Sequence, residues 1–234
     1  MLLIFLASVA AQASPTATAV SNTARSDVVV LGSREGFKIN TRALRAAQSE
    51  FLARKGQYAP NASLTFLVQR RYGRAFSARD LRIYATNGRD RISIDVHSDN
   101  TFSIAALPDA KWWVESNMSP RNWAIEPLVL SPGSNRTNYR LGDARLQCRA
   151  SWAMFKASGS ILAAPLVGVI QAAGPCTSRK VSIFASAPGP VQSAYVSEGS
   201  RTAPIKIGRG RDTYPLPGEN PTFSNDARVT VVAD

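Results

Sequence analysis

The sequence predicts a mainly β protein, an antiparallel β-sandwich, and three observations support this. Short apolar runs with a period of two residues recur along the chain, as in residues 64–68 and 92–96. Turn residues separate these runs at the spacing of a sandwich. Only one segment, residues 41–55, has clear helical periodicity. We therefore expect two small β domains preceded by one amphipathic helix.

The N-terminus has the pattern of a secretion signal. Its first eleven residues are apolar except for Ser8, and they lead into Ala11-Gln12-Ala13, the small-x-small pattern that signal peptidase reads. The apolar run is much shorter than the ~20 residues of a membrane-spanning helix. We expect a signal peptide at residues 1–13, a flexible leader at 14–26, and a periplasmic or secreted protein.

Cys148 and Cys176 are the two cysteines of the chain. An even number of cysteines in an exported protein predicts a disulfide. A redox pair would have C-x-x-C spacing, and a zinc site would need more thiols or imidazoles. We expect one disulfide that closes an apolar insert.

The chain carries a formal charge of +12, and 44% of its residues are hydrophobic. This hydrophobic content argues against a disordered protein. The arginines are scattered singly, without the block of like charges that marks a polyanion-binding tail. We interpret them as a solvated surface and keep a polyanion-binding protein as an alternative.

A strand at residues 27–31 and the helix at 41–55 form the predicted segment 27–60. Asn40 or Thr41 can cap the helix, and Gly56 follows Arg54-Lys55 as a stop signal. Apolar residues at helical spacing predict one buried face: Leu44, Ala47, Phe51 and Leu52.

A first β domain is expected at residues 61–147. Alternating runs at 64–69, 81–86, 92–97 and 101–104 predict a β-meander, with turns at Asn87-Gly88 and Asp99-Asn100. Residues 116–134 contain three prolines and predict a loop. Strand character resumes at 139–151.

A second β domain, residues 148–234, contains the disulfide-closed insert. Residues 152–173 are apolar and fit either short helical turns or two buried strands. Beyond Cys176, strands are expected at 181–185, 192–197, 203–207 and 228–232, with Pro/Gly-rich turns between them.

The segment 64–110 resembles the transthyretin-like, carboxypeptidase-regulatory-type β-sandwich. The strands LTFLV, DLRIYATNG and RISIDV are followed by SDNTFSI and by Leu107-Pro108. In that family a polar turn with Asp and Gly precedes a Phe-containing strand and a Leu-Pro step. Here Asn100 replaces the glycine, and Asp109-Ala110-Lys111-Trp112 replaces Gly-x-Tyr. The resemblance implies a structural or adhesive module without catalysis, and the second half resembles exported proteins of Gram-negative bacteria.

Asp95, His97 and Asp99 are the strongest metal candidates, and His97 is the only histidine. In an extended strand, alternate residues share a face, so two carboxylates and an imidazole could meet a divalent ion. We favour the simpler interpretation, a polar face opposite Ile92 and Ile94. We predict neither a metal nor a cofactor.

A tryptophan-rich segment is the candidate binding region. Trp112, Trp113, Arg121 and Trp123 could hold a glycan or peptide, because aromatic rings stack on sugars. Glu115 and Glu126 lie beside these tryptophans. They are the carboxylates that a polysaccharide hydrolase would use if they faced each other across a cleft.

The sequence therefore predicts an exported, non-catalytic binding or structural accessory protein of the bacterial cell envelope. Its expected partner is an envelope protein or glycan. A hydrolase that uses Glu115 and Glu126 is the enzymatic alternative.

Overall fold

The computed structural model describes residues 38–70, 81–104, 111–117, 123–158, 168, 171–172, 174–177, 182–207, 213–218 and 220–234. The predicted signal peptide, the leader and the strand at 27–31 lie outside these residues. Residues 34–234 belong to one compact unit. The division into two β domains stays a prediction.

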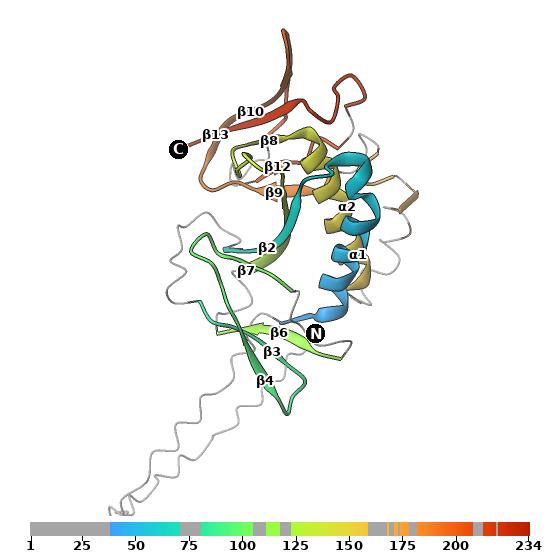
Figure 1. Cartoon of the computed structure of the whole chain (residues 1–234). Helices are drawn as coiled ribbons and strands as arrows, with labels where there is room; N and C mark the ends of the chain where they lie inside the picture. The colour runs from blue at the N-terminus through green and yellow to red at the C-terminus, as the bar shows by residue number, and fades with distance from the viewer. Residues whose placement is uncertain are drawn as a thin grey trace, which may run out of the picture. The chain divides into compact units, whose positions relative to one another are not determined.

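The described chain is mainly β, as predicted, with antiparallel sheets and two long helices, α1 (Thr41–Tyr58) and α2 (Leu141–Ala157) (Figure 1). The strands are β1 (Lys38–Asn40), β2 (Ser63–Arg70), β3 (Ile83–Thr86), β4 (Arg91–Ile94), β5 (Thr101–Phe102), β6 (Trp113–Ser116), β7 (Trp123–Leu130), β8 (Asn138–Arg140), β9 (Phe184–Ser186), β10 (Val191–Glu198), β11 (Arg201–Pro204), β12 (Thr213–Pro215) and β13 (Arg228–Ala233).

The strands form four sheets, with the orders β1-β6-β3-β4, β5-β2-β7, β11-β10-β13-β8 and β12-β9. The predicted hairpin at Asn87-Gly88 is confirmed, because β3 and β4 pair across it. The predicted meander is wrong: β2 pairs with β5 and β7, not with β3. Alternation marks a strand but does not choose its partner, because many neighbours can cover the same apolar face.

The predicted helix at 41–55 is confirmed and continues to Tyr58. The side chain of Asn40 caps it by accepting a hydrogen bond from the Arg42 amide at 2.8 Å. Gly56 does not stop the helix. The helix ends at Tyr58, just before Ala59-Pro60, because a proline disfavours helical backbone at the residue that precedes it. Leu52, assigned to the buried face, is 64% exposed.

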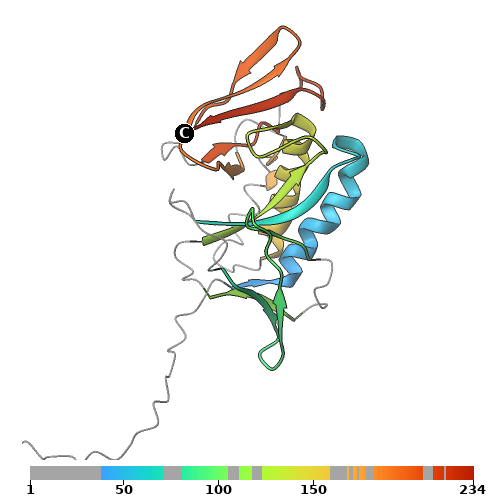
Figure 2. The same cartoon turned by 60° about the vertical axis from the view of Figure 1, so that its left-hand side comes forward.

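The strand predicted at residues 139–151 is wrong, because α2 begins at Leu141. The helix buries Leu141, Ala144, Cys148 and Trp152, which recur at helical spacing on one face. Asp143 fixes its first turn by accepting hydrogen bonds from the Arg140 amide and from the amide and hydroxyl of Ser131. Figures 1 and 2 show α2 lying along α1.

The loop predicted at residues 116–134 is also wrong, because β7 occupies much of it. The strand tolerates Pro127 because β7 lies at the edge of its sheet and pairs only with β2. Phe66 lies opposite Pro127, and its ring contacts Phe102 with centroids 5.7 Å apart.

Two large hydrophobic clusters hold these elements together. One joins α1 to the sheets of β2–β7 and includes Leu44, Phe66 and Val114. The other joins α2 to the C-terminal strands and contains Cys148 and Cys176. The predicted disulfide between these cysteines is confirmed, with Cα atoms 5.7 Å apart.

Hydrogen bonds connect the start of α2 to the end of α1 and to the segment 218–225. Gly142 donates its amide to the Asn225 carbonyl, and the Asn225 side chain donates to the Gln57 carbonyl. The Arg145 guanidinium donates to four oxygen atoms on this segment, which belong to Gly218, Asn220, Phe223 and Asn225. This junction positions the C-terminal segment beside the disulfide.

Candidate functional site

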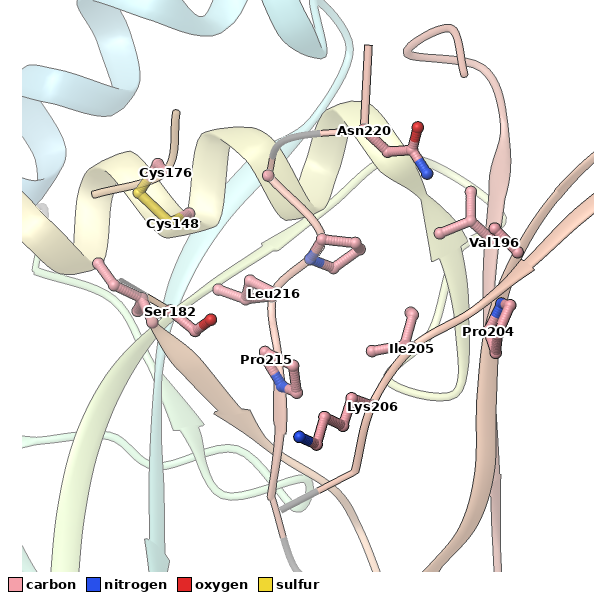
Figure 3. A pocket seen from close by; sticks show the side chains of 14 residues that line it. Cys148, Cys176, Ser182, Val196, Pro204, Ile205, Lys206, Pro215, Leu216 and Asn220 are labelled. Atoms are coloured by element: carbon pink, nitrogen blue, oxygen red, sulfur yellow. A yellow bond between two sulfur atoms is a disulfide. The ribbon is translucent and has the colours of Figure 1, made fainter. Parts of the chain in front are cut away.

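The candidate site is an apolar groove beside the disulfide, with a cavity volume of about 420 Å³. This volume falls within the roughly 300–1,000 Å³ of small-molecule pockets. In Figure 3, Ile205 and Lys206 come from one wall, and Pro215 and Leu216 come from the other. The residues that line it are Cys148, Cys176, Ser182, Ile183, Val196, Ala203, Pro204, Ile205, Lys206, Pro215, Leu216, Pro217, Gly218 and Asn220.

Buried core side chains also line the groove. Val196, Ile205 and Leu216 are each at most 9% exposed and belong to the C-terminal hydrophobic cluster. Pro204, Pro215 and Pro217 are more exposed and add further apolar surface. The groove is therefore continuous with the core and has few hydrogen-bonding side chains.

On each wall of the groove, a proline occupies a strand position whose backbone nitrogen points away from the neighbouring strand, so neither wall offers an N–H group there. The Ile205 amide donates inward to the Ala194 carbonyl, so the preceding residue, Pro204, turns its nitrogen away from β10. The Leu216 amide donates to the Ile183 carbonyl, so Pro215 likewise turns its nitrogen away from β9. Proline has no N–H at these positions, which prevents an added strand from accepting a hydrogen bond there.

The predicted tryptophan cluster is only partly described. Arg121 lies outside the described residues, as does the side chain of Trp123. Trp112 packs against the first hydrophobic cluster, whereas Trp113 on β6 is 38% exposed. Lys38 lies over the Trp113 ring, 5.5 Å from its centroid, and pairs with Glu115 at 2.9 Å.

Trp113 belongs to the outer face of the sheet β1-β6-β3-β4. The register places Thr86 opposite Trp113 and Tyr84 opposite Glu115, so Tyr84 is a diagonal neighbour of Trp113. The Arg91 guanidinium lies 4.1 Å from the centroid of the Tyr84 ring. Aromatic rings and cations therefore alternate on this face.

The structure does not gather Asp95, His97 and Asp99. The strand expected through these residues is wrong, because β4 ends at Ile94. Asp99 accepts hydrogen bonds from the amide and hydroxyl of Thr101 at 3.0 and 2.7 Å, which builds the following turn. Among the described residues, no group of three His, Cys, Asp or Glu side chains converges on one point.

Glu126 lies in a polar cluster that joins β7 to β9. Its carboxylate accepts hydrogen bonds from the amide and hydroxyl of Ser186 at 3.4 and 3.3 Å. Gln69 donates to the Ser186 hydroxyl, and Arg136 donates to the Ser186 carbonyl. Nearby, the Tyr139 and Tyr214 hydroxyls share a hydrogen bond of 2.9 Å.

The surroundings of Glu126 change its acidity. Burial raises its pKa from 4.5 to about 7, although hydrogen bonds from Ser186 and the charge of Arg136 act in the opposite direction. Burial also raises the pKa of Tyr214 to about 12. A carboxyl group of this kind can hold a proton near neutral pH, as a general acid does.

The cavity beside Glu126 is too small for catalysis on a polysaccharide. Its volume is about 10 Å³, enough for a single water molecule. Glu115 lies in a different sheet from Glu126 and lines a different cavity. The described geometry therefore offers no substrate cleft that these two carboxylates share.

We predict that Glu126 makes stability depend on pH. The pKa of Glu126 in the folded state lies above its value in the unfolded state. As pH rises, the unfolded state therefore loses its proton at a lower pH than the folded state does. The free energy of unfolding falls as pH rises from about 4.5 to 7. Glu126→Gln should remove this dependence and stabilise the protein by about 3 kcal/mol at pH 8. Urea unfolding at pH 5 and pH 8 measures it.

The control is Glu115→Gln, which removes a carboxylate on the outer face of another sheet. It breaks a partly exposed ion pair and should change stability by less than about 1 kcal/mol at either pH. Equal pH slopes for wild type and Glu126→Gln would contradict the prediction.

Sequence reasoning missed the groove. Its walls come from residues 203–206 and 215–218, where the sequence predicts a strand over the first segment and a Pro/Gly-rich turn over the second. The repeated pattern of a proline followed by a buried aliphatic residue, Pro204-Ile205 and Pro215-Leu216, was the available signal. The groove itself depends on bringing two distant segments together.

No helix within the described ranges is long and apolar enough to cross a membrane. Comparison with family models, with curated proteins and with solved structures found no match. The transthyretin-like resemblance of residues 64–110 therefore stays a prediction.

Proposed function

We propose that this protein is an exported, non-catalytic binding protein of the bacterial cell envelope, and that the groove beside the disulfide holds an apolar ligand. The observation that carries this proposal is a concave apolar surface of about 420 Å³ formed partly by core side chains. Burying apolar ligand surface there is favourable by about 25 cal/mol per Å².

The surroundings of the groove favour binding over reaction. The described lining has a serine, a lysine and an asparagine, Ser182, Lys206 and Asn220, but neither a carboxylate nor an imidazole. General acid–base chemistry most often uses a carboxylate or an imidazole within hydrogen-bond reach of the substrate, and Lys206 is the one titratable side chain in the described lining. Export brings the groove to the envelope, where apolar ligands are abundant.

A bulky side chain in the groove tests the proposal. Ser182 is exposed and lines the groove, so Ser182→Trp should weaken binding of 1-decanol, a neutral apolar probe, at least about tenfold. Ser193→Trp is the matched control, because Ser193 is also exposed but lies outside the groove lining. Titration calorimetry measures both. Failure of the wild type to bind 1-decanol would refute the proposal.

The outer face of the sheet β1-β6-β3-β4 supports a second candidate function, binding of an anionic polysaccharide. Trp113 and Tyr84 provide rings for stacking, and Lys38, Arg89 and Arg91 lie around a depression beside Trp113. Asp90 and Glu115 also line this depression, where Glu115 pairs with Lys38 and Asp90 accepts a hydrogen bond from the Asn87 side chain, so three cations face two carboxylates. Rings and cations together suit a sugar that carries acidic groups.

Trp113→Ala should weaken heparin binding about tenfold, because a ring contact of this kind contributes about 1–2 kcal/mol. Phe184→Ala is the control, since Phe184 is 51% exposed on β9. Affinity is measured at several salt concentrations. An equal loss of heparin affinity in both variants would contradict this second candidate function. So would binding that modest salt abolishes in the wild type and in both variants, because only non-specific charge attraction would then remain.

A further inference from the structure

A second cavity, of about 270 Å³, adjoins the groove and has a different chemical character. Cys176 and Gly218 line both cavities. The remaining lining residues of the second cavity are Tyr58, Arg145, Arg149, Thr177 and Pro221. An apolar cavity and a cationic cavity therefore meet at the disulfide.

The guanidinium groups of the two arginines in this cationic cavity make different contacts. Arg145 uses its guanidinium to bind four oxygen atoms of the segment 218–225, so it supplies charge but few free donors. Arg149 lies one helical turn further along α2, and its guanidinium lies 5.1 Å from the centroid of the Tyr58 ring. A cation–π contact of this kind holds the guanidinium beside the ring.

The described lining of the cationic cavity contains no carboxylate, and Glu219 lies outside the described residues. Glu198, which interacts electrostatically with Arg145, is itself held by Ser224 and Arg201. Burial lowers the pKa of Arg145, as expected for a cation that has lost part of its hydration. An anion bound in this cavity, which both arginines line, would offset the lost hydration.

We propose that the two cavities together bind a fatty acid, with its hydrocarbon chain in the proline-walled groove and its carboxylate on Arg149. This inference rests on the proposed function and names its ligand class. A single guanidinium matches a carboxylate with two parallel hydrogen bonds.

A hydrocarbon chain suits the groove better than an extended peptide does. A peptide carries an N–H and a C=O at each residue, and these groups need partners when they are buried. Pro204 and Pro215 withhold the donors that an added strand would use. A hydrocarbon chain needs no partners.

The test compares decanoate with 1-decanol, which has the same chain length but no charge, by titration calorimetry on the full chain at pH 8. The wild type should bind decanoate about tenfold more tightly than 1-decanol. Arg149→Gln should abolish this preference without changing 1-decanol binding, and Arg149→Lys should retain part of it. Lys156→Gln, which removes the same charge from an exposed residue of α2 outside both described cavity linings, should leave the preference intact.

Several results would overturn the inference. Equal losses from Arg149→Gln and Lys156→Gln would show general charge attraction, and a loss from Lys206→Gln without one from Arg149→Gln would place the carboxylate in the groove. Tighter binding of decyl phosphate or of N-acetylated pentaalanine than of decanoate would assign another ligand class. If 1-decanol binds but decanoate has no advantage, the inference fails and the proposed function stands. If neither binds, both fail.

Discussion

Gly142→Ala should destabilise the protein by about 3 kcal/mol and lower its melting temperature by roughly 6–12 °C. A Cβ atom at residue 142 would lie 2.1 Å from the backbone oxygen of Tyr58 and 3.1 Å from the Asn225 Cβ. The Tyr58 oxygen is a backbone atom, so relieving the clash requires α1 and α2 to move apart. Calorimetric unfolding measures the shift.

Gly56→Ala is a matched control for this prediction. Gly56 lies inside α1, where an added Cβ would meet no atom within 4 Å. The same substitution should stabilise the protein there by about 0.5–1 kcal/mol, because alanine favours helical backbone. A melting temperature for Gly142→Ala equal to that of the wild type would show that the contact with Tyr58 does not constrain the helices.

Removing the disulfide with Cys148→Ala and Cys176→Ala together should lower the free energy of unfolding by about 3.5 kcal/mol. The cysteines are 28 residues apart, and the value follows from the chain entropy that the cross-link removes from the unfolded state. The denaturation midpoint in guanidinium chloride measures the loss. Wild type held reduced during refolding should show the same midpoint.

The disulfide variant also tests the binding proposals. Cys176 lines both cavities, and its backbone faces Gly218, where a Cβ would come within 3.0 Å of the Cys176 carbonyl. Freeing this segment should weaken decanoate binding under conditions where the variant remains folded. Unchanged binding would mean that the cross-link stabilises the chain without shaping the groove.

Several elements were predictable because their cause is local. The first helix could be identified from the cap at Asn40 and from apolar residues at helical spacing, and the hairpin at Asn87-Gly88 from its turn residues. The boundaries were less certain, because Gly56 is tolerated inside a helix whereas Pro60 acts on the residue before it.

The errors arose where tertiary contacts outweigh local preference. Residues 139–151 alternate well enough to suggest a strand, yet their helical face packs against α1 and the C-terminal cluster. Pro127 suggested a loop, but β7 lies at the edge of its sheet, where a residue without an N–H group breaks no hydrogen bond to a further strand. Neither the packing partner nor the sheet order is encoded by neighbouring residues.

By itself, the sequence determined the mainly β class, the first helix and the disulfide, because periodicity, capping and cysteine count are properties of the chain. Only the tertiary structure decided the candidate site. The groove requires residues 203–206 and 215–218 to face each other, and the cationic cavity requires α2 to lie beside the disulfide. Such contacts join residues that are far apart in sequence, so their geometry follows from the packing of the whole core.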